Sequence, residues 1–301
     1  MAGGCEYIVS TSSAASDVPL EDKCRYYDDL QILELVMLSG LLVDYDFWNH
    51  VPNDVGVDAK FLPTENIKMQ QYLDNICHWS DQNKVLLNEV KSNFMVFTRC
   101  QSDFTVRLKM NYKSLDQVHA IKLLGVWVTE KMSWQLNTEE ACKKAYSRLS
   151  LLTKLKYVGV SRNDLIDVHK LFIRSHLEYC SVVFHTMLTN EQSRMYENVQ
   201  KVCLRVILAS DYVDYETALK TCFLSTLFSR RENRVLQFSL RALKHPKHAE
   251  MFPLSNKHEK NLHNLREHEK YVVNFANGEK YKSSFIPQAQ RKLNEYFQDK
   301  T

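Results

Sequence analysis

The stretch Lys23-Cys24-Arg25-Tyr26-Tyr27-Asp28-Asp29-Leu30-Gln31-Ile32-Leu33-Glu34-Leu35 places two neighbouring carboxylates between short runs of aromatic and aliphatic residues. This pattern predicts a β-hairpin whose turn carries the charge. Two adjacent aspartates repel each other and need a cation or solvent to compensate them. Their oxygen atoms suit Mg²⁺, which takes one or two protein carboxylates and leaves room for substrate phosphates. Taken alone, these residues fit a solvated acidic turn better than a metal site. The choice between these two interpretations therefore depends on the segments that follow.

Length and composition predict a globular protein of one large or two ordinary domains, since the chain has 301 residues and 45% of them are hydrophobic. Glycine loops that cradle nucleotides are excluded, because neither Gly-x-Gly-x-x-Gly nor a Walker motif occurs. The eight cysteines are scattered without a Cys-x-x-Cys pair, which predicts buried, reduced thiols. Neither a secretory signal nor a bilayer-spanning apolar run occurs. We therefore expect a soluble cytoplasmic or nuclear protein without membrane contact.

Charge is distributed unevenly, although the net charge is only +3. Residues 1–66 contain 12 Asp and Glu against 3 Lys and Arg, a balance of −9, so residues 67–301 carry +12. The acidic end suits a metal ion, and the basic remainder suits a phosphate backbone.

The middle of the chain predicts a helix followed by short strands. From Asn66 onward the apolar residues fall on one helical stripe formed by Met69, Tyr72, Leu73, Ile76 and Trp79. A turn over residues 88–92 then leads into a buried strand over residues 94–97. Alternation at Val106, Leu108 and Met110 predicts a half-exposed strand, and the apolar run over residues 122–128 bends at Gly125. We expect Trp79, Trp127 and Trp134 to pack in the core or hairpins rather than to stack on bases.

Helices follow from about residue 136. Asn137 and Glu140 form a candidate capping box for a helix with Cys142, Ala145, Leu149 and Leu152 on its apolar face. The candidate nucleic-acid-binding residues lie on its polar face: Lys143, Lys144, Arg148, Lys154 and Lys156. Further helices are predicted from Ser161, over 191–208 and over 229–244. Their inward residues are predicted to be Leu165, Val168, His169, Phe172, Ile173, His176 and Leu177, then Met195, Val199, Val202 and Val206. The two histidines are interpreted as core residues rather than zinc ligands.

The order of these segments resembles the back half of the reverse transcriptase of a non-LTR, LINE-like retrotransposon. The resemblance runs from about Lys23 to about Pro253. Tyr26-Tyr27-Asp28-Asp29 is similar to the family's catalytic box, and Leu87-Asn88-Glu89-Val90-Lys91-Ser92 to the box that follows it. Lys122-Leu123-Leu124-Gly125-Val126-Trp127 resembles the hairpin that grips the primer, and residues 143–207 resemble the helical thumb and its continuation.

The resemblance implies RNA-directed DNA polymerase chemistry, in which two Mg²⁺ ions support nucleotidyl transfer on an RNA template and a DNA primer. Asp28 and Asp29 would be the catalytic, metal-binding residues, with Tyr27 and Lys91 at the substrate. Primer contacts are implied for Leu124, Gly125 and Trp127.

The implied fold is α+β, with a partial palm of antiparallel hairpins plus a helix, followed by an all-helical thumb-like domain. We assign residues 1–20 to a flexible lead-in, 21–135 to a truncated palm, 136–250 to the thumb-like domain and 251–301 to a loosely ordered basic tail. The family's fingers and a third catalytic aspartate precede its Asp-Asp box, but only about 25 residues precede Tyr26. We therefore expect a truncated polymerase that is inactive alone unless another segment supplies the missing palm and fingers, because catalytic residues act as a unit.

Two alternatives stay open from the residues themselves. The chain could be a non-catalytic nucleic-acid-binding or interaction protein that uses its basic helices. It could also be the product of a non-functional reading frame that folds only in part, for which a broad melting transition would be the sign.

Overall fold

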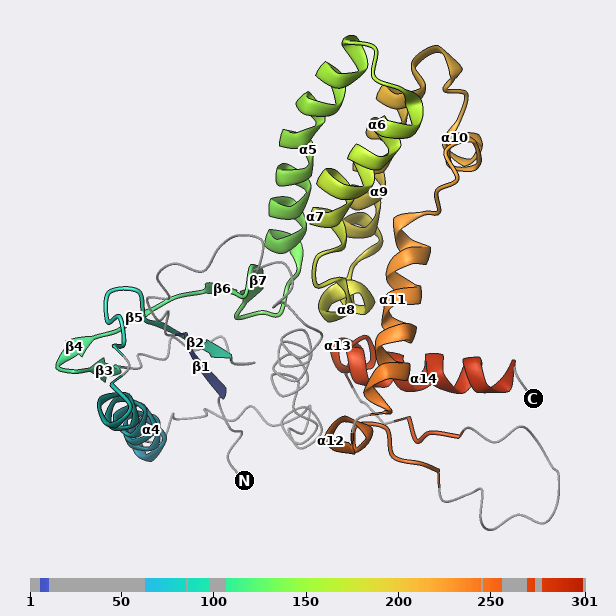
Figure 1. The fold of residues 1–301 in the computed structure, drawn as a ribbon. Coiled ribbons are helices and arrows are strands. Elements are labelled where there is room, and N and C mark those ends of the chain that lie inside the picture. The colour runs from blue at the N-terminus through green and yellow to red at the C-terminus, as the bar shows by residue number, and fades with distance from the viewer. Residues whose placement is uncertain are drawn as a thin grey trace, which may run out of the picture. The chain divides into compact units, whose positions relative to one another are not determined.

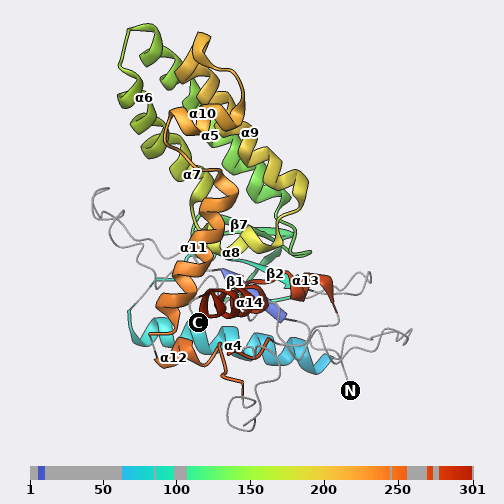
Figure 2. The same cartoon turned by 90° about the vertical axis from the view of Figure 1, so that its right-hand side faces the viewer.

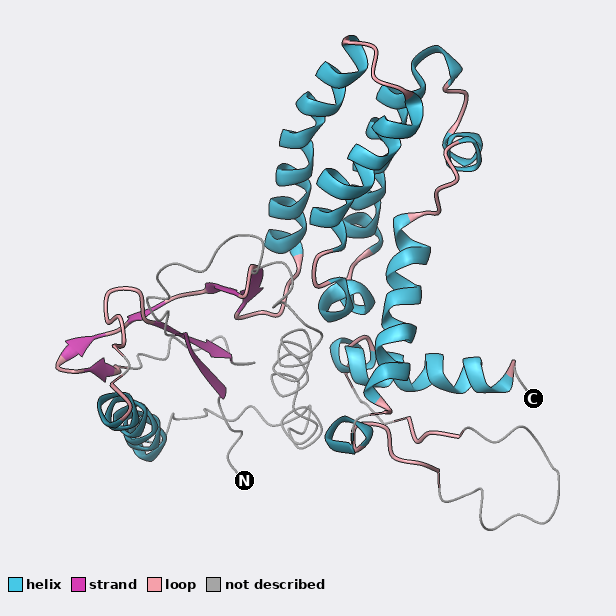
Figure 3. Ribbon diagram, in the orientation of Figure 1, coloured by secondary structure: helices cyan, strands magenta, loops and turns pink. Residues whose placement is uncertain are grey.

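The computed structural model describes residues 6–10, 63–84, 86–97, 107–244, 246–255, 270–273 and 278–299. The chain divides into two compact units, which are described separately below. Among the described residues, the first unit contains 6–10 and 63–133 and the second begins at Trp134. Small sheets are confined to the first unit and most helices belong to the second (Figures 1 and 3), so the predicted α+β class is confirmed. None of the described helices is both long and apolar enough to cross a membrane.

The first unit is built on a small sheet in the order β1-β2-β5. Strand β1 (Glu6–Ser10) pairs antiparallel with β2 (Asn93–Phe97), and β2 pairs parallel with β5 (Asp116–Gln117). The predicted buried strand over 94–97 is therefore confirmed. Residues 6–10 were expected in a flexible lead-in; they form a strand instead, as the aromatic and β-branched run Tyr7-Ile8-Val9 favours.

Two hairpins and one helix complete the first unit. The hairpins join β3 (Lys109–Met110) to β4 (Lys113–Ser114) and β6 (Ala120–Leu123) to β7 (Val126–Thr129). Helix α4 (Pro63–Gln82) contacts β3, where the side-chain amide of Gln70 donates to the Lys109 carbonyl at 2.7 Å. The Lys109 N–H donates back to Gln70 Oε1 at 2.9 Å. The glutamine side chain therefore satisfies both backbone groups of Lys109, as a neighbouring strand would.

The core of this unit is a cluster of six buried hydrophobic side chains with Cys77 and Leu87 packed against it: Leu73, Phe94, Val96, Leu108, Met110 and Leu115. The burial of Leu73 agrees with the predicted stripe of α4. Ile76 and Trp79 were predicted on the same stripe, but they are 41% and 56% exposed. The buried face instead follows Leu73, Cys77 and Ser80, a spacing of four and three residues that also fits a helix.

The second unit is helical. Its longer helices are α5 (Gln135–Tyr157), α9 (Asn190–Leu208), α11 (Leu227–Ala242) and α14 (Phe285–Gln298). Between α5 and α9 the chain forms α6 (Arg162–Val168), a π-helical turn η1 (His169–Arg174), α7 (Ser175–Glu178), α8 (Ser181–Phe184) and the 3₁₀ turn η2 (His185–Met187). The remaining elements are η3 (Ala209–Asp211), α10 (Tyr215–Thr221), α12 (Pro246–Ala249) and α13 (Glu279–Lys282).

Packing in the second unit joins α5 to α9 and to the η1–α7 segment, whereas α11 contacts α8, α9 and α14 (Figures 1 and 2). Aromatic rings connect these layers. The ring centroids of Trp134 and Phe184 lie 5.9 Å apart, and those of Phe184 and Tyr196 lie 6.0 Å apart. Trp134 is 3% exposed, which confirms its predicted place in the core.

Residues 278–299 depart from the prediction of a loosely ordered tail. Helix α14 buries Phe285, Ala289 and Leu293, and the Phe285 ring meets the Phe238 ring of α11 edge to face at 5.5 Å. The prediction rested on the polar composition after Pro246, and it gave too little weight to the apolar residues that return after Tyr271.

Several predicted helix faces are shifted. Helix α5 begins at Gln135 without a side-chain cap, so Asn137 lies in its first turn and is buried rather than capping it. In α9 the predicted inward residues Met195, Val202 and Val206 are only half-buried, while Tyr196, Cys203 and Ile207 are buried. The Ser161 cap is confirmed, since Ser161 Oγ accepts from the Asp164 N–H at 3.3 Å.

Candidate nucleic-acid interface

The predicted catalytic and metal-binding residues Asp28 and Asp29, together with Tyr27, lie outside the described residues, so the structure gives their predicted roles no geometry. Within the described ranges, no group of three or more His, Cys, Asp and Glu side chains could hold a metal ion. The candidate site is therefore built from the basic and primer-contacting residues that were predicted further along the chain.

Lys91 lies in the predicted turn directly before β2. Asn88 Oδ1 accepts hydrogen bonds from the backbone N–H groups of Val90 and Lys91, both at 3.1 Å, and Ser92 Oγ donates to the Asn88 carbonyl at 2.8 Å. An asparagine that caps the following N–H groups in this way fixes a tight turn. Lys91 is exposed on this turn, where its ammonium group is available to an anion.

The predicted bend at Gly125 is a two-residue hairpin turn, because Leu123 pairs with Val126 across β6 and β7. Both turn residues are left-handed, with φ of 44° at Leu124 and 90° at Gly125. Such turns favour Asn-Gly, so Gly125 fits its position and Leu124 is held there against its preference. Trp127 is half-buried on β7, and Lys122 Nζ lies 5.9 Å from the centre of its indole ring. Leu124 is 41% exposed at the tip of this hairpin.

Helix α5 presents a basic face to solvent. From Ala141 to Tyr157 it contains five lysines and arginines and no Asp or Glu, and Lys143, Lys144, Arg148 and Lys154 are exposed. The opposite face is buried through Cys142, Ala145 and Leu152. The only ion pair described on this face joins Lys143 Nζ to Glu140 Oε1 at 3.6 Å, and the Lys143 side chain remains 80% exposed.

Lys156, the fifth predicted nucleic-acid contact, lies on another side of α5. At about 100° per residue it is rotated by about 220° from Lys143, toward the buried face. Its Nζ donates to the Ile207 carbonyl at 2.9 Å and so satisfies a free carbonyl at the end of α9. This contact assigns Lys156 to helix capping rather than to nucleic-acid binding. The prediction was wrong because the sequence pattern did not separate Lys156 from the exposed lysines of α5.

Two histidines, His169 and His176, lie in η1 and α7, which both contact α5. Burial lowers the pKa of His176, and the nearby cations Arg148 and Lys144 lower it further. Burial likewise lowers the pKa of His169 to about 4, although the Gln200 side chain opposes this shift. His169 is fully buried, which confirms its predicted place in the core, whereas His176, also predicted there, is only half-buried. Helix α7, which carries His176, contacts α5.

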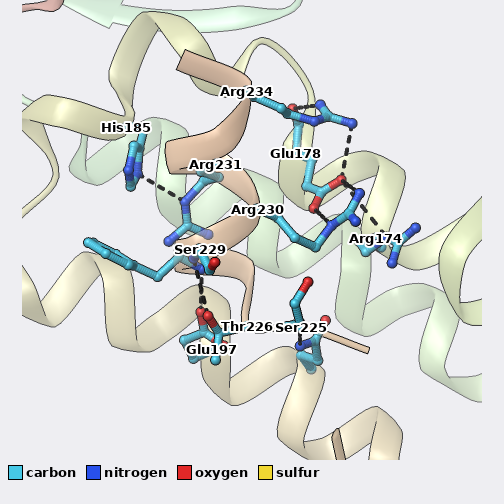
Figure 4. A network of polar contacts seen from close by, with 12 residues as sticks. Arg174, Glu178, His185, Glu197, Ser225, Thr226, Ser229, Arg230, Arg231 and Arg234 are labelled. Carbon is cyan, nitrogen blue, oxygen red and sulfur yellow. Dashed lines mark hydrogen bonds and ion pairs between the residues drawn. The ribbon is translucent and has the colours of Figure 1, made fainter. Parts of the chain in front are cut away.

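A second cationic group was missed by the sequence analysis. Arg174, Arg230 and Arg234 surround the carboxylate of Glu178, which is 2% exposed (Figure 4). The run Ser229-Arg230-Arg231-Glu232-Asn233-Arg234 at the start of a predicted helix was the available signal. The grouping itself could not be read from the sequence, because Glu178 is separated from Arg230 by 52 residues.

The fourth arginine in this region serves packing. Arg231 is buried, donates to His185 Nδ1 at 3.3 Å and to Ser193 Oγ at 3.2 Å, and stacks over Tyr196 with 4.9 Å between its guanidinium carbon and the ring centre. Burial and this guanidinium lower the pKa of His185 to about 3. A neutral imidazole can accept the hydrogen bond from a guanidinium, so this contact favours the neutral form of His185.

Cysteines in the described part of the chain are free thiols. Cys142, Cys180, Cys203 and Cys222 are buried, and Cys77 is half-buried. Burial raises the pKa of all five, to about 11 for Cys142 and Cys180 and to about 12 for Cys203. A raised pKa favours the thiol over the nucleophilic thiolate. The burial of four of these five cysteines agrees with the prediction of mostly buried thiols.

Comparison with known proteins adds no relative. No family model, no curated protein and no solved structure matches this chain. The arrangement of charges on the helical unit is therefore the basis for a functional proposal.

Proposed function

We propose that this chain binds nucleic acid along the basic face of α5, as the thumb-like part of a protein of the non-LTR reverse transcriptase type. The observation that carries the proposal is the one-sided helix. Lys143, Lys144, Arg148 and Lys154 are exposed, no acidic residue follows Glu140 on α5, and the other face is fixed in the core. Such a row of cations attracts a phosphate backbone without regard to its base sequence.

The reverse transcriptase part of the proposal is supported by the order of the sequence motifs. The turn that presents Lys91 and the hairpin that presents Leu124 precede α5 in the order that the resemblance implies. Mg²⁺ would be held by Asp28 and Asp29, since paired carboxylates provide the hard oxygen ligands this ion prefers. When bound, such ions stabilise the charges that develop during phosphoryl transfer. Lys91 would contact the phosphates of the nucleotide, and Leu124, Gly125 and Trp127 would position the primer backbone.

Nucleic-acid binding is tested by measuring the affinity for a fluorescent single-stranded oligonucleotide over a range of KCl concentrations. The variant Lys143→Gln/Lys144→Gln/Arg148→Gln removes three exposed charges and retains the buried face of α5. For single strands, each phosphate contact contributes about 0.7 to the slope of log affinity against log salt, so three contacts contribute about 2.1. Between 50 and 200 mM salt the wild-type affinity should then fall about 18-fold more than that of the variant. Equal slopes would contradict the proposal.

Polymerase activity is tested separately by primer extension with an RNA template, a DNA primer and Mg²⁺. Asp28→Asn/Asp29→Asn is the matched variant, because it removes both charges with little change in volume. Incorporation by the wild type that is lost in this variant would support catalysis by these carboxylates. Incorporation that is equal in both proteins would contradict their proposed role, and no incorporation by either would leave only the binding proposal in place.

A further inference from the structure

Three arginines share one buried carboxylate on the helical unit. Glu178 accepts from Arg230 through Nε at 2.5 Å and Nη2 at 3.1 Å, and Arg234 Nη2 lies 3.1 Å from the same carboxylate (Figure 4). Arg234 Nη1 also donates to the Glu178 backbone carbonyl at 2.9 Å. Arg174 is more loosely attached, with its Nε 3.8 Å from Glu178 Oε2. The carboxylate holds the three guanidinium groups together.

The group is not neutral. Three guanidinium charges and one carboxylate leave a net charge of +2, and burial together with Arg230 lowers the pKa of Arg174. Like charges held this close repel one another, so a bound anion would stabilise the arrangement. The side chains become more exposed from Arg174 at 15% through Arg230 at 30% to Arg234 at 47%. The excess positive charge is therefore accessible from solvent on the side of Arg234.

Local helix geometry brings these side chains together. Arg230 and Arg234 are four residues apart on α11, and so are Arg174 and Glu178 at the junction of η1 and α7. Residues four apart share one face of a helix. The π-helical turn η1 ends at Arg174, and such a turn holds about one residue more than an α-helical turn, which rotates the following residues by about 100°. π turns of this kind occur often at functional sites.

We propose that Arg174, Arg230 and Arg234, positioned by Glu178, form a phosphate-binding site for nucleic acid. The inference rests on the proposed function and extends it from α5 to a second site. A guanidinium fork can donate two parallel hydrogen bonds to a phosphate, and the contacts with Glu178 use only some of the five N–H donors of each arginine. A net charge of +2 matches either two neighbouring diester phosphates or one dianionic terminal phosphate.

The surroundings favour a polyanion that carries bases. The same short segment, Arg174–Glu178, has the cations of α5 near His176 on one side and the arginines of α11 on the other. A strand that crosses this segment would meet both groups. Tyr179, which directly follows Glu178, is 39% exposed, and Phe172 is 46% exposed. Aromatic side chains beside a phosphate-binding site can stack on bases.

The test compares Arg230→Gln/Arg234→Gln with Arg194→Gln, which removes an exposed charge from α9 outside the group. Binding of 20-nucleotide single strands with either a 5′-hydroxyl or a 5′-phosphate is measured against KCl concentration. Contacts with two diester phosphates predict that the double variant lowers the salt slope by about 1.4 for both strands. Recognition of a terminal phosphate predicts a loss with the phosphorylated strand alone. Slopes equal to those of wild type and Arg194→Gln for both strands would overturn the inference.

Glu178→Gln provides a test of opposite sign. It keeps all three guanidinium groups, an amide oxygen that can still accept from Arg230 and the backbone carbonyl that accepts from Arg234. It removes only the negative charge that competes with a phosphate, so affinity for the oligonucleotide should rise several-fold at low salt. Loss of affinity in this variant, with helical circular dichroism retained, would contradict the inference. If the variant fails to fold, Arg234→Gln alone decides the question, since two arginines still pair with Glu178. Polyglutamate that displaces the oligonucleotide at an equal concentration of charge would instead indicate an acidic protein ligand and overturn the inference.

Failure of this inference can be told apart from failure of the proposed function. If Lys143→Gln/Lys144→Gln/Arg148→Gln lowers the salt slope while the arginine variants do not, nucleic acid binds α5 and the arginines serve only packing. If neither set changes the slope, both proposals fail.

Discussion

Acidification should destabilise the helical unit through His169. Its side chain is fully buried and burial lowers its pKa to about 4, whereas the unfolded chain takes up a proton near the ordinary value of about 6.5. A depressed pKa in the folded state contributes stability that is complete above about pH 6.5 and is lost as the pH falls toward 4. At pH 5 the loss attributable to this one residue is about 2 kcal/mol. His185 should act in the same direction, because burial, Arg231 and Lys292 lower its pKa to about 3.

The matched variant is His169→Gln, which keeps a polar side chain opposite Gln200 and cannot be protonated. The sequence has four tryptophans, so a background with Trp48, Trp79 and Trp127 changed to phenylalanine leaves Trp134 to report on the helical unit alone. Urea unfolding is followed by its fluorescence at pH 7 and pH 5. The loss of stability on acidification should be smaller by about 2 kcal/mol in His169→Gln than in the parent. His119→Gln, in the other unit, is the control. Equal pH dependence in parent and His169→Gln would refute the described burial of His169.

Three further predictions concern positions where structure and sequence disagree or where the backbone is held against its preference. Leu293→Ala should cost about 2–5 kcal/mol in urea unfolding monitored at Trp134, because α14 belongs to the helical core; a change below about 1 kcal/mol would restore the expectation of a loose tail. Leu124→Asn should stabilise the β6–β7 hairpin by up to about 1 kcal/mol, since asparagine tolerates a φ of 44° better than leucine; destabilisation would contradict the observed turn. Lys156→Met should cost about 1 kcal/mol of stability and leave the salt slope of oligonucleotide binding unchanged, because its ammonium group caps α9; a lower slope would return Lys156 to the binding face.

Hydrophobic periodicity in the sequence predicted where most helices and strands lie, but not which of their faces are buried. In α9 the predicted stripe followed methionine and valine, yet Gln192 and Gln200 are among the buried residues. Gln200 Nε2 donates to the Tyr215 hydroxyl and to the Ser225 carbonyl, both at 3.0 Å. Burial of the amide nitrogen costs little when its hydrogen bonds are made, and these two partners come from segments that follow α9 in the chain. Hydrophobic periodicity cannot reveal such partners.

The prediction of which residues face the core failed at η1 for a different reason. The spacing around Ser161 predicted both Phe172 and Ile173 to point inward, but Phe172 is 46% exposed while Ile173 is buried. A stripe drawn at 3.6 residues per turn assumes α-helical geometry, and the π turn over His169–Arg174 changes that phase. The arginine group around Glu178 begins at the end of the same turn, and it joins residues that lie 52 positions apart, which no local pattern reveals.

The charged face of α5 was predictable because it depends on one helix alone. Lys143, Lys144, Arg148 and Lys154 are exposed as their spacing from Cys142, Ala145 and Leu152 predicted. The metal hairpin around Asp28 and Asp29 lies outside the described residues and stays a prediction.

The most direct test of nucleic-acid binding by α5 is photo-crosslinking from its basic face. Leu151 is 40% exposed and lies three residues from both Arg148 and Lys154, so a benzophenone amino acid at this position would stand among the proposed phosphate contacts. The same amino acid at Phe223, which is 95% exposed in the turn after α10, is the control. The account predicts that a labelled oligonucleotide crosslinks at position 151 and not at position 223, and that crosslinking falls as salt rises. Equal yields at both positions, or crosslinking at 223 alone, would contradict the claim that nucleic acid binds the basic face of α5.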